Sequence, residues 1–149
     1  MMNTFAWTFQ GGKIRIIKSL VSVAGNVATT IRPEQGKRWI VMSLRLHIVA
    51  DANAANRIAR PTITDGTSTM LQLVENTAAI VANETKDVEW LSGQSYGESD
   101  GVGGNLLMVG TFPNVLLDYY SSLRLILTIV NGLAGDTYDY YLTVLEVEI

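Results

Sequence analysis

The chain has no cysteine and only one histidine, His47, among its 149 residues. Without cysteine there is no disulfide bond, no thiolate metal site and no thiol nucleophile. A single histidine excludes a multi-histidine metal centre within one protomer. We therefore expect neither a bound metal ion nor a cofactor.

Charge is also scarce, since Asp, Glu, Lys and Arg make up 17% of the residues against about 25% in a typical protein. The 11 Lys and Arg against 14 Asp and Glu give a net charge of −3, without the basic surplus that contacts to nucleic-acid phosphates require. The apolar runs are shorter than the roughly 18 residues of a membrane helix, and the N-terminus lacks the layout of a signal peptide. We expect no nucleic-acid partner, no membrane partner and no Sec export.

The remaining composition is apolar, with 48% hydrophobic residues and a mean hydropathy of +0.21. A single domain of this length exposes a large share of its surface. So apolar and charge-poor a chain predicts that further surface is covered by copies of itself or by a partner. The alternative is a monomer whose surface is polar but uncharged, rich in Thr, Ser, Asn and Gly.

Alternation of apolar and polar residues is the main structural signal. It predicts a long strand from Arg38 to Ala50, with shorter strands before and after it, separated by turn signals such as Asp65-Gly66. Residues 70–83 fit a helix or two short strands, and the pattern favours strands. We predict an all-β fold, an antiparallel β-sandwich with jelly-roll-like topology and about 8–10 strands. The core of its long strand should consist of Ile40, Met42, Leu44, Leu46 and Ile48.

The first twelve residues are set apart by three alternating aromatics, Phe5, Trp7 and Phe9, followed by Gly11-Gly12. This pattern is typical either of a first strand or of an extended arm that docks on a neighbour. No linker follows. We therefore divide the chain into an arm or first strand, residues 1–12, and a single β-sandwich domain, residues 13–149.

His47 is the first candidate for catalysis, because it shares a strand face with Ser43 and Arg45. A nucleophile–base pair needs a partner that sequence alone does not place. A single histidine on a mixed strand face is more typical of a surface or interface residue.

Two pairs of carboxylates at alternate positions are the second candidate: Glu146 with Glu148, and Asp87 with Glu89. Paired carboxylates perform glycoside hydrolysis when their separation is suitable. On strands, such residues more commonly keep an exposed face soluble and block edge-to-edge pairing. We therefore expect no catalytic residues and no enzymatic activity.

The glycine-rich segment 97–105 offers oxygen ligands for calcium or backbone amides for phosphate, but it matches neither an EF-hand nor a phosphate-loop pattern. A surface loop is the simpler interpretation. Aromatic residues elsewhere suit either a sugar-stacking platform or sandwich cores and interfaces. They are Trp7, Trp39, Trp90, Tyr119, Tyr120, Tyr138, Tyr140 and Tyr141.

From Ile31 onward the chain shows a characteristic order of short segments. They are Arg32-Pro33, Gly36-Lys37-Arg38-Trp39-Ile40-Val41, Asn56-Arg57, Asp65-Gly66, Phe112-Pro113-Asn114-Val115-Leu116-Leu117 and Ala134-Gly135-Asp136. This order resembles the small virion structural proteins of tailed bacteriophages, the head decoration or auxiliary proteins and related tail β-sandwich proteins. The resemblance covers about three-quarters of the chain and rests on pattern.

The resemblance implies a non-enzymatic protein that decorates or cements a bacteriophage capsid as a homo-oligomer, most often a trimer. Its partners would be itself and the major capsid protein or another virion protein, and its location the virion, or the host cytoplasm during assembly. No catalytic residue is transferred by it.

The residues themselves suggest where such an oligomer makes contact. The last segment, 138–149, has two apolar faces, and one of them must meet something other than the core of the chain. We predict an oligomer or capsid interface made of Phe5, Trp7, Phe9, Tyr140, Leu142 and Val144.

The alternative function is a carbohydrate- or receptor-binding β-sandwich module of a phage tail fibre or baseplate. Such a module should show exposed aromatics around a concave patch, whereas a cementing protein buries its aromatics between subunits. A third function, a small hydrolase, would use His47 or the Glu146 and Glu148 pair.

Overall fold

A computed structural model describes residues 12–18, 23–25, 28–73, 75, 79–92, 106–113, 115–120 and 123–149. The described residues form β-strands without any helix, which confirms the all-β class. Phe5, Trp7 and Phe9, and the glycine-rich segment 97–105, lie outside them. The strands are β1 (Lys13–Lys18), β2 (Val23–Ala24), β3 (Ala28–Ile31), β4 (Lys37–Val49), β5 (Ile58–Thr64), β6 (Thr69–Gln72), β7 (Thr85–Ser92), β8 (Leu106–Phe112), β9 (Leu116–Asp118), β10 (Arg124–Val130) and β11 (Thr137–Glu148).

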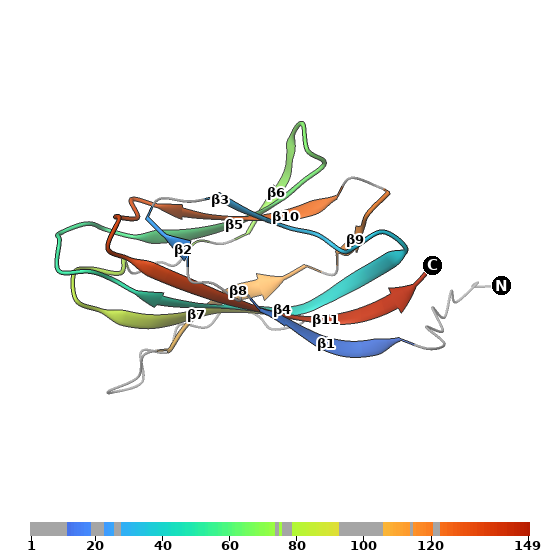
Figure 1. Cartoon of the computed structure of the whole chain (residues 1–149), viewed down its shortest axis with the longest axis horizontal. Helices are drawn as coiled ribbons and strands as arrows, with labels where there is room; N and C mark the ends of the chain where they lie inside the picture. Colours follow the sequence, from blue (N-terminus) through green and yellow to red (C-terminus); the bar gives the residue numbers. More distant parts are fainter. Residues whose placement is uncertain are drawn as a thin grey trace.

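Two sheets lie in stacked layers (Figure 1). The larger has the order β1-β11-β4-β7-β8, with β2 also pairing with β11 and β9 with β4, and the smaller has the order β3-β10-β5-β6. The predicted β-sandwich is thereby confirmed, whereas the jelly-roll topology stays a prediction. One pair, β7 with β8, is parallel.

The core lies between the layers, because every second residue of the central strands points to the opposite sheet. Trp90 of β7 and Leu46 of β4 are fully buried, as are Leu125 and Ala59 of the small sheet. In the segment 70–83, β6 and an isolated bridge at Ile80 agree with the interpretation as short strands.

A β-bulge divides β4 in two. Val41 lies opposite Val144 of β11, and Ser43 lies opposite Thr143, so that Met42 is an extra residue on β4. An extra residue in one strand of a pair reverses the alternation of its side chains. The two halves of β4 therefore bury residues of opposite parity.

The bulge corrects the predicted core of this strand. Leu44, Leu46 and Ile48, which follow the bulge, are fully buried as predicted. The prediction for Met42 is wrong, since 41% of it is exposed, and Ile40 is only partly buried because it belongs to the other face. The residues that face the core before the bulge are Trp39 and Val41.

The faces of β11 are likewise the reverse of the prediction. Leu142 and Val144 are fully buried in the sandwich core, and Tyr140 is partly buried against it. The four-stranded sheet of the same chain therefore covers the face that we assigned to an oligomer interface. Leu145 and Val147 lie on the opposite, outer side of the strand.

The hydrogen bonds of Glu146 explain why the face of β11 that carries this carboxylate is the buried one. The Trp39 indole donates a hydrogen bond to its Oε2 at 2.9 Å, and Arg15 Nη1 lies 2.9 Å from Oε1. Burial opposes ionisation, but these hydrogen bonds outweigh it and hold the pKa of Glu146 below its usual range. The expectation that Glu146 keeps an exposed face soluble is wrong, because it is 8% exposed.

A buried ion pair closes one end of the sandwich. Arg57 and Asp136 are both fully buried, and the guanidinium donates from Nε and Nη2 to the two carboxylate oxygens at 2.9 and 2.8 Å. Arg57 Nη2 also contacts Asp51 Oδ1 at 2.7 Å, while Tyr138 and the amide of Leu133 donate to Asp136. The network joins the loop after β4 to the turn before β11.

The pH dependence of stability should reflect Asp136. Burial opposes its ionisation, but the hydrogen bonds from Arg57 and from backbone amides prevail and hold the pKa of Asp136 well below its usual range. A carboxylate with a lowered folded-state pKa stabilises fully above its unfolded value of about 3.9 and loses that contribution as pH falls towards the folded pKa. We expect the free energy of unfolding, measured by urea titration, to fall below about pH 4. Asp136→Asn should show a smaller slope there, and an unchanged slope would contradict this assignment.

Candidate functional site

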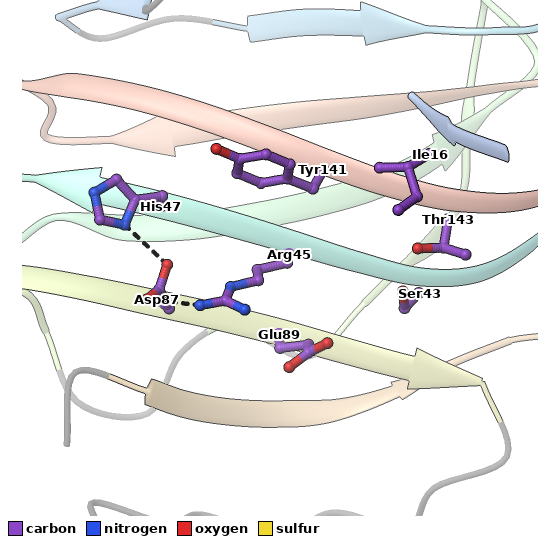
Figure 2. Close-up of a pocket in the computed structure, with 8 residues that line it drawn as sticks. All are labelled: Ile16, Ser43, Arg45, His47, Asp87, Glu89, Tyr141 and Thr143. Atoms are coloured by element: carbon purple, nitrogen blue, oxygen red, sulfur yellow. Dashed lines mark hydrogen bonds and ion pairs between the residues drawn. The ribbon is translucent and has the colours of Figure 1, made fainter. Parts of the chain in front are cut away.

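The candidate site lies on the outer face of the seven-stranded sheet, the side turned away from the four-stranded sheet. A hollow of about 590 Å³ lies here, and Figure 2 shows the side chains of the residues that line it. They come from β1, β4, β7 and β11. The lining residues are Ile16, Ser43, Arg45, His47, Asp87, Glu89, Tyr141 and Thr143.

Strand register brings these residues together from distant parts of the chain. On one side of β4, Asp87 lies opposite His47 and Glu89 opposite Arg45. On the other side, Tyr141 lies opposite Arg45. Residues directly opposite each other in antiparallel strands point to the same face, so each row across β7, β4 and β11 presents its side chains to the hollow.

Asp87 joins the two basic side chains of the hollow. Its Oδ1 lies 2.9 Å from His47 Nδ1, and its Oδ2 accepts a hydrogen bond of 3.0 Å from Arg45 Nη2 (Figure 2). Partial burial opposes ionisation of Asp87, but the contacts with Arg45 and His47 outweigh it and lower the pKa of the carboxyl. Its hydrogen bond with Asp87 in turn raises the pKa of the Arg45 guanidinium. The Asp87 carboxylate is thus held in place by its contacts with Arg45 and His47.

The structure supplies the partner that sequence did not place for His47, and it is the carboxylate Asp87. The third element of a hydrolytic triad is not adjacent: Ser43 is four residues from His47 on the same strand, which is roughly 13 Å at the rise of a strand. The carboxylates do not form one group either. Glu146 belongs to the core side of β11, whereas Asp87 and Glu89 belong to the outer face of β7.

The aromatic residues named as a possible platform are dispersed. Trp39, Trp90 and Tyr138 are buried in the core. The ring centroids of Tyr119 and Tyr120 lie 5.5 Å apart, edge to face, on the segment after β9. Trp7 lies outside the described residues. Of the aromatics that the structure describes, Tyr141 alone lines the hollow, with 37% of its surface exposed.

Beside the hollow, a row of apolar side chains crosses four strands. Ile14 pairs with Leu145, Leu145 with Ile40, and Ile40 with Leu116. Ile14 is 67% exposed at the edge strand β1, and Leu116 is 38% exposed on β9. Exposed Ile16 and Met42 extend this row. We call the following set the apolar strip: Ile14, Ile16, Ile40, Met42, Leu116 and Leu145.

The sequence pattern did not identify the apolar strip. The segment 13–18 shows β-prone apolar residues among Lys and Arg, but nothing in it states that this strand is the edge of a sheet. The only available signal was the general apolar excess, which predicted covered surface without locating it.

Within the described part of the chain, no group of three or more His, Asp or Glu side chains is placed to hold a metal ion. The same residues include no helix with the length and apolar character to cross a membrane. Comparison of the chain with protein-family models, curated proteins and solved structures gives no match.

Proposed function

We propose that the protein is a non-enzymatic structural protein that assembles as a homo-oligomer, a trimer, through the apolar strip. The observation that carries this proposal is a continuous apolar row that reaches β1, the last strand of the described sheet on that side, where Ile14 and Ile16 are each 67% exposed. Exposed apolar side chains on an edge strand invite pairing with another chain. A second copy is the occupant that we propose, because the charge-poor composition predicts covered surface and the resemblance implies a homo-oligomer.

We further propose that this oligomer decorates or cements a bacteriophage capsid, with the major capsid protein or another virion protein as its partner. Support comes from the resemblance to phage virion proteins and from the β-sandwich that this resemblance implies. The docking arm, residues 1–12, belongs to the same proposal, since Phe5, Trp7 and Phe9 are suited to adding a strand to a neighbouring sheet.

Disruption of the strip should dissociate the oligomer. Native mass spectrometry of the wild type should give three times the chain mass of 16.3 kDa. Ile14→Glu, and separately Leu116→Glu, should raise the dissociation constant at least about 100-fold, because burying an unpaired charge in an apolar contact costs several kcal/mol.

Met70→Glu is the matched control, because Met70 is 61% exposed on β6 of the other sheet. This variant should remain oligomeric, and all three variants should keep cooperative melting. A wild-type monomer at micromolar concentration would overturn the proposal. So would an oligomer that resists Ile14→Glu and Leu116→Glu but dissociates with Met70→Glu.

The virion assignment has its own test. Particles assembled by the genome that encodes this chain should contain it in multiple copies, measured by quantitative mass spectrometry of purified heads. Deletion of its gene should yield shells that release DNA at lower temperature. Particles without the chain, or a chain found only in purified tails, would contradict the head assignment.

A further inference from the structure

We infer that the hollow on the outer face is a binding site for a neutral carbohydrate, a pyranose with several hydroxyl groups and one apolar face. This inference does not rest on the proposed assembly, and the lining of the hollow shares only Ile16 with the apolar strip. The inference rests on the contacts and exposure of Asp87, Arg45 and Tyr141.

The shape of the hollow suits a small ligand. Its volume of about 590 Å³ lies within the range of small-molecule sites. The floor consists of hydrogen-bonded strands rather than loops, because β4 pairs with β7 on one side and with β11 on the other. Such a floor holds its side chains at fixed spacing before a ligand arrives, which lowers the entropic cost of binding.

The polar groups of the hollow combine donors and acceptors at short range. Asp87 and Glu89 accept hydrogen bonds, Arg45 donates them, and Ser43 and Thr143 do both. Arg45 has five N–H donors, and its hydrogen bond to Asp87 Oδ2 uses one of them. A sugar hydroxyl donates and accepts at the same time, so a vicinal pair of hydroxyls can bridge a carboxylate and the guanidinium.

Other ligand classes fit this lining less well. An anion attracted by Arg45 would meet the carboxylates of Asp87 and Glu89 in the same hollow. A bare cation would meet the guanidinium, which already neutralises Asp87 at 3.0 Å. A wholly apolar ligand would remove these charges from water without replacing their hydrogen bonds, at a cost of several kcal/mol. A neutral polyol avoids each of these costs.

Tyr141 supplies the apolar surface that the C–H face of a sugar needs. Its ring lies on β11 beside the hollow (Figure 2), where 37% of the residue is exposed. The aliphatic side chain of Ile16 lines the same hollow from β1. An aromatic ring with exposed area next to charged hydrogen-bonding groups combines apolar contact and polar orientation in one site.

The test uses the full chain and three probes: galactose, mannose and N-acetylglucosamine. Each is titrated to millimolar concentration while amide ¹H–¹⁵N spectra are recorded. At least one sugar should bind with a dissociation constant on the order of 1 mM and shift the amides of residues 45, 87 and 141. Tyr141→Ala should weaken that binding at least about tenfold, as loss of a central aromatic contact does. Glu89→Gln should weaken it with the tyrosine intact.

Tyr120→Ala is the matched control, because Tyr120 is an exposed tyrosine on the segment after β9 rather than in the hollow. It should leave binding unchanged. No binding of any of the three sugars would overturn the inference, as would binding that survives Tyr141→Ala. Tighter binding of glucose 6-phosphate than of the neutral sugars would show an anion site instead. Native mass spectra of each variant report separately on assembly, so failure here leaves the proposed oligomer standing.

Discussion

Arg57→Ala is expected to lower the free energy of unfolding by about 3–5 kcal/mol, the range for breaking a buried ion pair by removal of one partner. The substitution leaves Asp136 fully buried with a charge whose bidentate partner is gone. It also removes the hydrogen bond of 2.7 Å to Asp51 Oδ1, one of the contacts that join the loop after β4 to the turn before β11. The Asp51 amide still donates to Asp136 Oδ1 at 2.8 Å. Urea unfolding monitored by the core tryptophans measures the change.

Arg60→Ala is the control for this prediction. Arg60 lies three residues further along and forms an ion pair with Glu75, but these two side chains are 39% and 27% exposed, whereas Arg57 and Asp136 are fully buried. Exposed pairs contribute about 0–1 kcal/mol, so this variant should remain close to the wild type. Equal losses for Arg57→Ala and Arg60→Ala would show that the network at Asp136 is not stabilising. Arg57→Lys should fall between the two, because an ammonium cannot reproduce the bidentate contact.

The sequence predicts the strands of this fold well, because alternation over many residues has no competing interpretation. The segment 85–91 becomes β7, and Leu125, Leu127 and Ile129 bury one face of β10 as period two requires. The turn signals Asp65-Gly66 and Asn131-Gly132 fall between strands as well, and Asn131 has the positive φ of 59° that such a turn allows.

Which face of a strand is buried is harder to predict. β11 carries apolar residues on both faces, so composition does not indicate which face is buried. The carboxylate of Glu146 predicts that its own face is exposed, and this prediction is wrong. The burial of Glu146 depends on Trp39, which is 107 positions away in the chain and donates to it at 2.9 Å. A contact of that separation is decided by sheet order, and the local pattern holds no information about it.

The candidate site also depends on sheet order. His47 was identifiable from its strand, and Asp87 from its own, but only the register of β4 against β7 places them 2.9 Å apart. Likewise Ile14 and Leu116 belong to one row only because β11 and β4 lie between their strands. Surface sites on a sheet are assembled across strands, whereas sequence periodicity describes one strand at a time.

The bulge in β4 allows a direct test of the uninterrupted strand that the sequence predicts against the bulged strand of the structure. Uninterrupted alternation places Met42 and Leu44 on one buried face, so truncation of either should cost the same. In the structure Leu44 is fully buried, whereas Met42 is the extra residue and is 41% exposed. Leu44→Ala should therefore lower the free energy of unfolding by about 2–5 kcal/mol, and Met42→Ala by roughly 0.5 kcal/mol or less.

Met42 also belongs to the apolar strip, so self-association would add to the apparent cost of truncating it. Both substitutions are therefore best measured by urea unfolding in the Ile14→Glu background, where we expect the chain to be monomeric. Under those conditions only contacts within one chain contribute. Similar losses for Met42→Ala and Leu44→Ala would contradict the bulge and support an uninterrupted β4. A large loss of unfolding free energy for Leu44→Ala, with little loss for Met42→Ala, would show that β4 changes face at Met42. This change of face places Ile40 in the apolar strip and Ser43 in the hollow.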